Sequence, residues 1–370
     1  MSQALQSMTQ EHAESARWSR PVQWYRTPLP PNVLKKLHTR SDLLGALQTL
    51  GYLGLLVVTG GLAVYSAGRW PWWSTLLLTF LHGTCFAFQI NAVHELGHGT
   101  VFKTRWLNAL FERVFSFLGW INFHMFDTSH VRHHQFTLHP PDDLEVVLPI
   151  KILRKQFLRD GFINPRVASW ILKNTWRIAR GRFEGEWELA LFPANEPERR
   201  RLPVRWARIL LIGHGLILFG SVAAAWLIHP RFLMIPVVVS FAPCYGAWLH
   251  MLCNNTQHIG LQDNVPDFRL CCRTFTTNPI VQFLYWHMNY HIEHHMYAAV
   301  PCYRLGALHL AILHDLPPTP HGLRATWKEI FAILEQQEKD PTYQYQPPCP
   351  NPRPKDIDER RAPALQPARA

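Results

Sequence analysis

Four long apolar stretches constrain the fold of this 370-residue chain more than any other feature. They cover residues 43–68, 70–93, 207–228 and 232–252, and Arg208 is the only Asp, Glu, Lys or Arg in them. Each stretch holds about the 20 residues that a helix needs to cross a bilayer. Charged residues make up 17% of the chain, which is below the roughly 25% usual for soluble domains. The sequence therefore predicts an all-α integral membrane protein with four transmembrane helices, rather than a soluble protein with buried core helices.

Short links within each pair of stretches predict two helical hairpins. The links are centred on residues 68–71 and on residues 229–231. The flanking segments, before residue 43 and over residues 151–201, are rich in Lys and Arg. Because loops with excess positive charge stay in the cytoplasm, we expect a multi-pass protein with both termini cytoplasmic and the two links on the far side.

Composition divides the chain into three parts. We expect residues 1–42 to be a cytoplasmic N-terminal segment and residues 43–340 to form the membrane domain. Residues 341–370 are rich in Pro and charge and are predicted to be disordered. The net charge of +11 suits attraction to anionic lipid headgroups. No aromatic and basic reading motif accompanies it, so no nucleic acid partner is expected.

Histidines gather in three short motifs near the ends of the apolar stretches. "HELGH" occupies 94–98, "HVRHH" occupies 130–134 and "HIEHH" occupies 291–295. Residues three or four apart lie on one side of a helix, so each motif can present its imidazoles together. The distribution of Lys and Arg assigns all three motifs to the same side of the membrane. We therefore expect a helical cytoplasmic domain that carries them.

A further histidine, His258 in "NNTQHIG", follows the fourth stretch, with Asn254 one helical turn before it. Neutral imidazole is a common ligand for zinc, iron and copper. A single zinc takes four ligands and usually three from protein, so the whole set fits two metals better than one. Redox chemistry on an apolar substrate at a membrane face favours iron. The candidate ligands are His94, His98, His130, His133, His134, His258, His291, His294 and His295.

Two other classes of protein compete with this interpretation. "HELGH" matches the zinc-protease pattern H-E-x-x-H, in which Glu95 would be the general base. A protease would leave the histidines of the other two motifs without a role. A metal-binding transporter should carry polar or broken helices in the membrane, and the four stretches contain no acidic residue.

The three motifs resemble those of the membrane fatty acid desaturase and hydroxylase superfamily, whose pattern is H-x-x-x-H, H-x-x-H-H and H-x-x-H-H. The resemblance covers about residues 40–305. It implies a non-haem di-iron centre held by the nine histidines, O2 as co-substrate, and a water-mediated metal contact for Asn254. It also implies a separate electron donor, either a ferredoxin or a cytochrome b5 with its reductase, because the chain shows no electron-transfer motif of its own.

Several acidic residues and one more histidine lie beside the motifs. Such groups orient ligand imidazoles in many metal sites, and each of the carboxylates could equally be solvated at the surface. These candidates are Glu95, Asp142, Asp143, Glu145, His287 and Glu293.

The sequence thus predicts an O2-dependent oxidoreductase that introduces a double bond into a fatty acyl or lipid chain. The same histidine motifs also serve hydroxylases and ketolases that act on alkanes, sterols or carotenoids, so this alternative stays open, as does the zinc protease.

Overall fold

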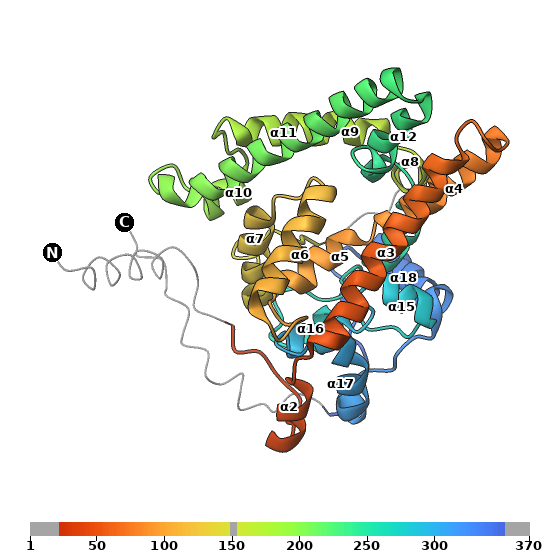
Figure 1. The fold of residues 1–370 in the computed structure, drawn as a ribbon. Helices are drawn as coiled ribbons and strands as arrows, with labels where there is room; N and C mark the ends of the chain where they lie inside the picture. The colour runs from red at the N-terminus through yellow and green to blue at the C-terminus, as the bar shows by residue number, and fades with distance from the viewer. Residues whose placement is uncertain (1–21, 149–153, 352–370) are drawn as a thin grey trace.

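The computed structural model describes residues 22–148 and 154–351. Within these residues all regular secondary structure is helical, and strand pairing is limited to isolated bridges (Figure 1). The predicted all-α class is therefore confirmed. The N-terminal segment before residue 22 lies outside the described residues.

Three helices in the described part of the chain are long and apolar enough to cross a membrane. The first is α3 (Asp42–Ser66), which begins where Ser41 accepts a hydrogen bond from the N–H of Leu44. The second runs through α4 (Trp72–Phe86) into α5 (Gln89–Gly97). The third is α11 (Pro197–Leu227). Exposed leucine, valine, phenylalanine and tryptophan side chains cover the outer faces of these helices, which is the surface that lipid requires.

The fourth apolar stretch does not form the single helix that the sequence predicts. Proline lacks a backbone N–H and interrupts a helix, and this stretch contains Pro236 and Pro243. Gly246 follows at φ +76°, outside the helical region. The prediction of four transmembrane helices is therefore not confirmed. The stretch consists of the short elements η1 (Pro230–Leu233), α12 (Met234–Val238), η2 (Ala242–Cys244) and α13 (Trp248–Asn254).

The helices are arranged as two apolar arms on a compact body (Figure 1). In one arm α3 packs along α4, and in the other α9 (Pro165–Ala179) packs along α11. The Arg208 guanidinium joins these last two helices by donating to the carbonyl of Ala179 at 3.0 Å. Two shorter helices precede and follow α9 in the sequence, namely α8 (Arg154–Phe162) and α10 (Glu186–Leu191).

The body contains the remaining helices and surrounds the histidine motifs. Its largest fully buried side chains include Trp286, Tyr285, Phe268 and Phe115. These helices are α2 (Pro31–Leu37), α6 (Arg105–Leu118), α7 (Phe123–Phe136), α14 (Phe268–Cys271), α15 (Pro279–Leu284), α16 (His291–Met296), η3 (Cys302–Arg304), α17 (Leu305–Ile312), η4 (Leu313–Asp315) and α18 (Gly322–Lys339).

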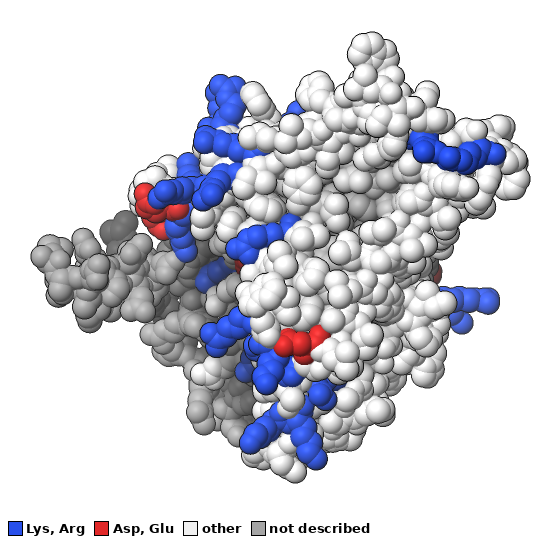
Figure 2. All heavy atoms as spheres, viewed as in Figure 1, with Lys and Arg blue, Asp and Glu red and all other residues white. Residues whose placement is uncertain are grey.

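Charge is distributed unevenly over the surface. Figure 2 shows one face, on which Lys and Arg gather towards the lower and left parts while the surface over α3 and α4 is largely uncharged. The largely uncharged surface therefore lies over two of the helices that are apolar enough to cross a membrane.

The first part of the C-terminal tail, residues 341–351, makes contacts with the body. Gln262 donates to the carbonyl of Tyr345 at 3.1 Å, and Gln344 donates to Asp263 at 2.9 Å. Arg269 donates to the carbonyl of Asn351 at 3.0 Å. The prediction of disorder rests on composition alone, whereas these hydrogen bonds depend on surfaces formed by residues distant in sequence. Residues 352–370 lie outside the described part of the chain.

Candidate metal centre

Three helices and one loop bring the nine candidate histidines together in the body. The first motif lies at the end of α5, with His98 as the residue that caps it. The second and third motifs lie on α7 and α16. His258 is different, because it follows α13 in a segment without regular secondary structure.

The nine side chains form two groups. Within each group, one ring nitrogen from every histidine lies within 4.8 Å of those of the other members. The first group contains His94, His98, His130, His134 and His294. The second contains His133, His258, His291 and His295.

The spacing of the motifs explains this division. Residues four apart lie almost above one another on a helix, whereas a residue three positions along is rotated to the opposite side of that line. The pair His130 and His134 therefore belongs to one group while His133 turns to the other. On α16 the pair His291 and His295 belongs to the second group, and His294 reaches across to the first. Each H-x-x-H-H motif thus contributes to both groups.

Ring nitrogens face one another across each group. Nε2 of His134 lies 2.9 Å from Nε2 of His130 and 3.1 Å from Nε2 of His294. In the second group Nε2 of His291 lies 3.0 Å from Nε2 of His258. The Nε2 atoms of His98 and His295 are buried and have no hydrogen-bond partner. Converging nitrogens and orphaned buried acceptors are what a metal-binding site requires, so these residues fit the two metals that the motifs imply.

Burial keeps most of these imidazoles neutral, which leaves their lone pairs available. Removal from water lowers the pKa of His258 to about 3 and that of His98 to about 4. It holds the pKa values of His130, His134, His291, His294 and His295 well below the usual range. His133 differs. Its burial also lowers the pKa, but the hydrogen bond to Asp143 and the charges of Asp143 and Glu145 outweigh burial and raise it.

Three of the candidate orienting carboxylates contact the histidine groups. Glu95 accepts from Nδ1 of His94 at 3.0 Å and lies 3.3 Å from Nδ1 of His294. A carboxylate can only accept, so a proton on Nδ1 leaves the Nε2 lone pair free for a metal.

The other two such contacts involve the second motif. Asp143 accepts from Nδ1 of His133 at 2.8 Å, and Glu145 accepts from Nδ1 of His130 at 2.9 Å. The side chain of Asp143 is fully buried. The negative charge beside each ring strengthens the hydrogen bond and fixes the ring orientation.

Three other candidates have partners away from the groups. Asp142 lies 3.9 Å from the Arg132 guanidinium. Glu293 is fully buried and accepts from Thr274 and from Nδ1 of His309. His287 pairs with the Gln282 amide at 3.0 Å. Asn254 ends α13, four residues before His258, and its water-mediated metal contact stays a prediction.

Sequence reasoning missed two groups that hold ligand candidates. The hydroxyl of Thr137 lies 3.2 Å from Nδ1 of His295. The carbonyl of Cys271 accepts from Nδ1 of His258 at 2.7 Å. Thr137 lies four residues after His133, and that spacing was its only signal. A backbone carbonyl leaves none, because every residue has one.

The family is decided by comparison with known proteins. A family model described as fatty acid desaturase matches residues 70–327, a range that includes all nine candidate histidines and the helices α4, α9 and α11. The chain belongs to the fatty acid desaturase family. A search among curated proteins found no match to it. Membership in this family supports an oxidoreductase that binds metal through its histidine groups and acts at a membrane on lipid. The superfamily predicted from the three motifs is therefore confirmed.

Proposed function

We propose that this desaturase-family protein is an O2-dependent oxidoreductase that uses two irons to introduce a double bond into a fatty acyl or lipid chain. The observation that carries the proposal is the pair of adjacent, buried histidine groups in a chain of this family. All nine histidines are proposed as ligands, five to one iron and four to the other. Imidazole ligands without thiolate leave positions for oxygen, as non-haem iron sites require.

The bound irons would supply reduction of O2 and removal of hydrogen from an unactivated C–H bond. In the balanced reaction, one O2, two electrons and two protons combine with the two hydrogens removed from the chain to give a double bond and two waters. The electrons come from a separate protein, a ferredoxin or a cytochrome b5 with its reductase, which we place on the basic surface of the body.

The residues of the chain bind the metals, orient the ligands and exclude water. The nine imidazoles hold the metals, while Glu95, Asp143 and Glu145 fix the rotation of the rings that they contact. Burial of both groups keeps bulk water away from a reactive centre. The apolar arms would let a hydrocarbon chain reach the body from the bilayer. We further propose that the histidine groups and both termini face the cytoplasm, as the basic flanking segments indicate, with the short elements η1 to α13 returning the chain to that side after α11.

The zinc-protease alternative assigns Glu95 a different role, and the geometry argues against it. A protease base must face a metal-bound water. Glu95 instead contacts Nδ1 of two imidazoles, His94 and His294, from different motifs. This arrangement suits a carboxylate that orients ligands.

Expression with an electron-donor system, followed by mass spectrometry of total lipids, tests the reaction. Desaturation reduces the mass of the product by about two units, and hydroxylation raises it by about sixteen. The second result would support the hydroxylase alternative in place of the desaturase.

Variants test the assignment of ligands. His133→Ala and His294→Ala should abolish turnover and lower the iron content from about two per chain. Glu95→Gln should keep most of the iron and lose roughly 10–100-fold in metal affinity or activity. His314→Ala is the control, since His314 is exposed and lies outside both groups. One zinc per active chain, or an inactive Glu95→Gln beside a normal His294→Ala, would instead support the protease.

A further inference from the structure

His258 is the one candidate ligand that no histidine motif places. The other eight lie in or at the end of helices that carry at least one more ligand candidate. His258 lies in an irregular segment between α13 and α14. A ligand must be held to within about 0.5 Å of its working position. Other parts of the chain must therefore fix this loop.

Arg273 binds the backbone on both sides of His258. One of its terminal nitrogens donates to the carbonyls of Thr256 and Ile259, at 2.7 Å and 3.0 Å. Its backbone N–H donates to the carbonyl of Gln257 at 2.8 Å. These three bonds hold the residues immediately around the histidine, in addition to the bond from Nδ1 of His258 to Cys271.

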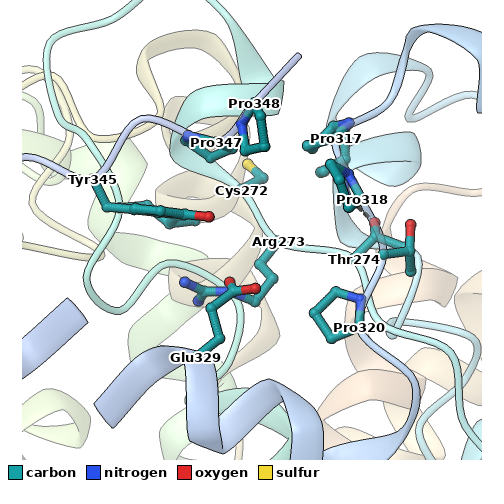
Figure 3. A pocket seen from close by; sticks show the side chains of 13 residues that line it. Cys272, Arg273, Thr274, Pro317, Pro318, Pro320, Glu329, Tyr345, Pro347 and Pro348 are labelled. Atoms are coloured by element: carbon teal, nitrogen blue, oxygen red, sulfur yellow. Dashed lines mark hydrogen bonds and ion pairs between the residues drawn. The ribbon is translucent and has the colours of Figure 1, made fainter. Parts of the chain in front are cut away.

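The guanidinium that makes these bonds is itself buried. Arg273 is only 4% exposed, and an unpaired charge at such a position is costly. Glu329 on α18 supplies the counter-charge, with 3.1 Å between its carboxylate and Nε of Arg273. Figure 3 shows the two side chains together at the wall of a small cavity that Tyr345, Pro347 and Pro348 also line.

Apolar side chains of α18 also pack against the loop that contains His258. Trp327 and Ile330 form a buried cluster with Ile259. Ile333 packs so closely on Gly260 that an added Cβ would lie 2.9 Å from its Cγ2. Gly260 has φ +79°, which also favours glycine. Beyond α18, residues 344 and 345 bond to Asp263 and Gln262. Residues 322–351 thus wrap the loop, and we call them the C-terminal clamp.

We propose that Arg273 and Glu329 are positioning residues that hold His258 in the second histidine group, and that the C-terminal clamp brings Glu329 to Arg273 over the loop. The inference rests on the proposed function. Glu329 lies beyond residue 327, where the match to the family model ends, so the family comparison does not assign it a role.

The test isolates the second group by removing the first. In a His94→Ala background, the remaining iron should reside in the group that contains His258. Adding Glu329→Gln should lower the affinity for that iron by roughly 10–100-fold. The affinity is measured as the iron retained per chain at increasing concentrations of a chelator. Glu335→Gln on the same helix is the matched control, because Glu335 is exposed and pairs only with Lys339 among the described contacts. Glu329→Asp should restore most of the affinity.

A second variant separates positioning from folding. Arg273→Met combined with Glu329→Leu replaces a half-buried ion pair by apolar side chains, and such replacements are often neutral for stability. It should keep the unfolding temperature within a few degrees of the parent while iron is still lost from the second group. Equal iron affinity in Glu329→Gln and Glu335→Gln, or iron loss that only follows a fall in unfolding temperature, would overturn the inference. A parent chain that binds fewer than two metals contradicts the proposed function, and this inference with it.

Discussion

Replacing Asp143 with asparagine should weaken metal binding in the second histidine group. The carboxylate accepts three hydrogen bonds without any exposure to water. Oδ2 accepts from Nδ1 of His133 and from the N–H of Leu138, both at 2.8 Å, and Oδ1 accepts from the N–H of Glu145 at 2.9 Å. Asparagine offers one acceptor oxygen and one NH2 group. Whichever way it is rotated, at least one of the three donors must face another donor.

The magnitude follows from these contacts. A buried donor without a partner costs about 1–3 kcal/mol, and hydrogen bonds to a charged group contribute about 1.5–3 kcal/mol each. Asp143→Asn should therefore lower the free energy of unfolding by about 3 kcal/mol. If asparagine turns its NH2 group towards His133, Nδ1 loses its acceptor and the ring loses its fixed orientation. Loss of such a partner typically weakens a metal site by roughly 10–100-fold.

Two measurements check the expectation. Competition with a chelator gives the metal affinity, and thermal unfolding of the metal-free protein in detergent gives the stability. Asp142→Asn is the matched control, since the carboxylate of Asp142 faces Arg132 rather than a histidine. If Asp143→Asn and Asp142→Asn bind metal equally well, the reasoning that Asp143 orients His133 is refuted.

Three further predictions concern residues away from the ligands. His287→Ala should keep both metals and lose about 1 kcal/mol of stability, because His287 bonds to Gln282 and belongs to neither group; loss of one metal would contradict this. Burial, and then the neighbouring Glu112, raise the pKa of Asp127 to about 8. The folded state therefore holds a proton that the unfolded state releases at lower pH, so stability should fall as pH rises towards about 8; Asp127→Asn should flatten this dependence in thermal unfolding. A cysteine at Arg69 should be labelled from outside intact cells, and labelling only after permeabilisation would contradict the proposed topology.

Local sequence patterns are sufficient to predict the long helices and the candidate residues of the site. Long apolar runs are sufficient to predict α3, α4 and α11, because a helix satisfies its own backbone hydrogen bonds wherever it lies. The histidine spacing predicts which side chains share a side of one helix, because that depends only on local geometry. The nine candidate ligands and the family could therefore be predicted without coordinates.

Contacts between residues distant in sequence control the remaining features of the site. Asp142 and Asp143 are adjacent and chemically identical, yet only Asp143 reaches a histidine, because the loop after α7 turns one of them inward and the other towards Arg132. The ion pair beside the loop that contains His258 joins residues that are 56 positions apart, Arg273 and Glu329.

Two further features show the limits of hydropathy and composition. Hydropathy measures apolar length and gives no weight to Pro236, Pro243 and Gly246, which divide the fourth stretch into short elements. Composition predicts disorder over residues 341–370, and it carries no information on partners such as Gln262 and Arg269, which the folded body brings to residues 345 and 351. Periodicity and composition report the preferences of a segment for itself, whereas such contacts depend on the surface against which the segment finally packs.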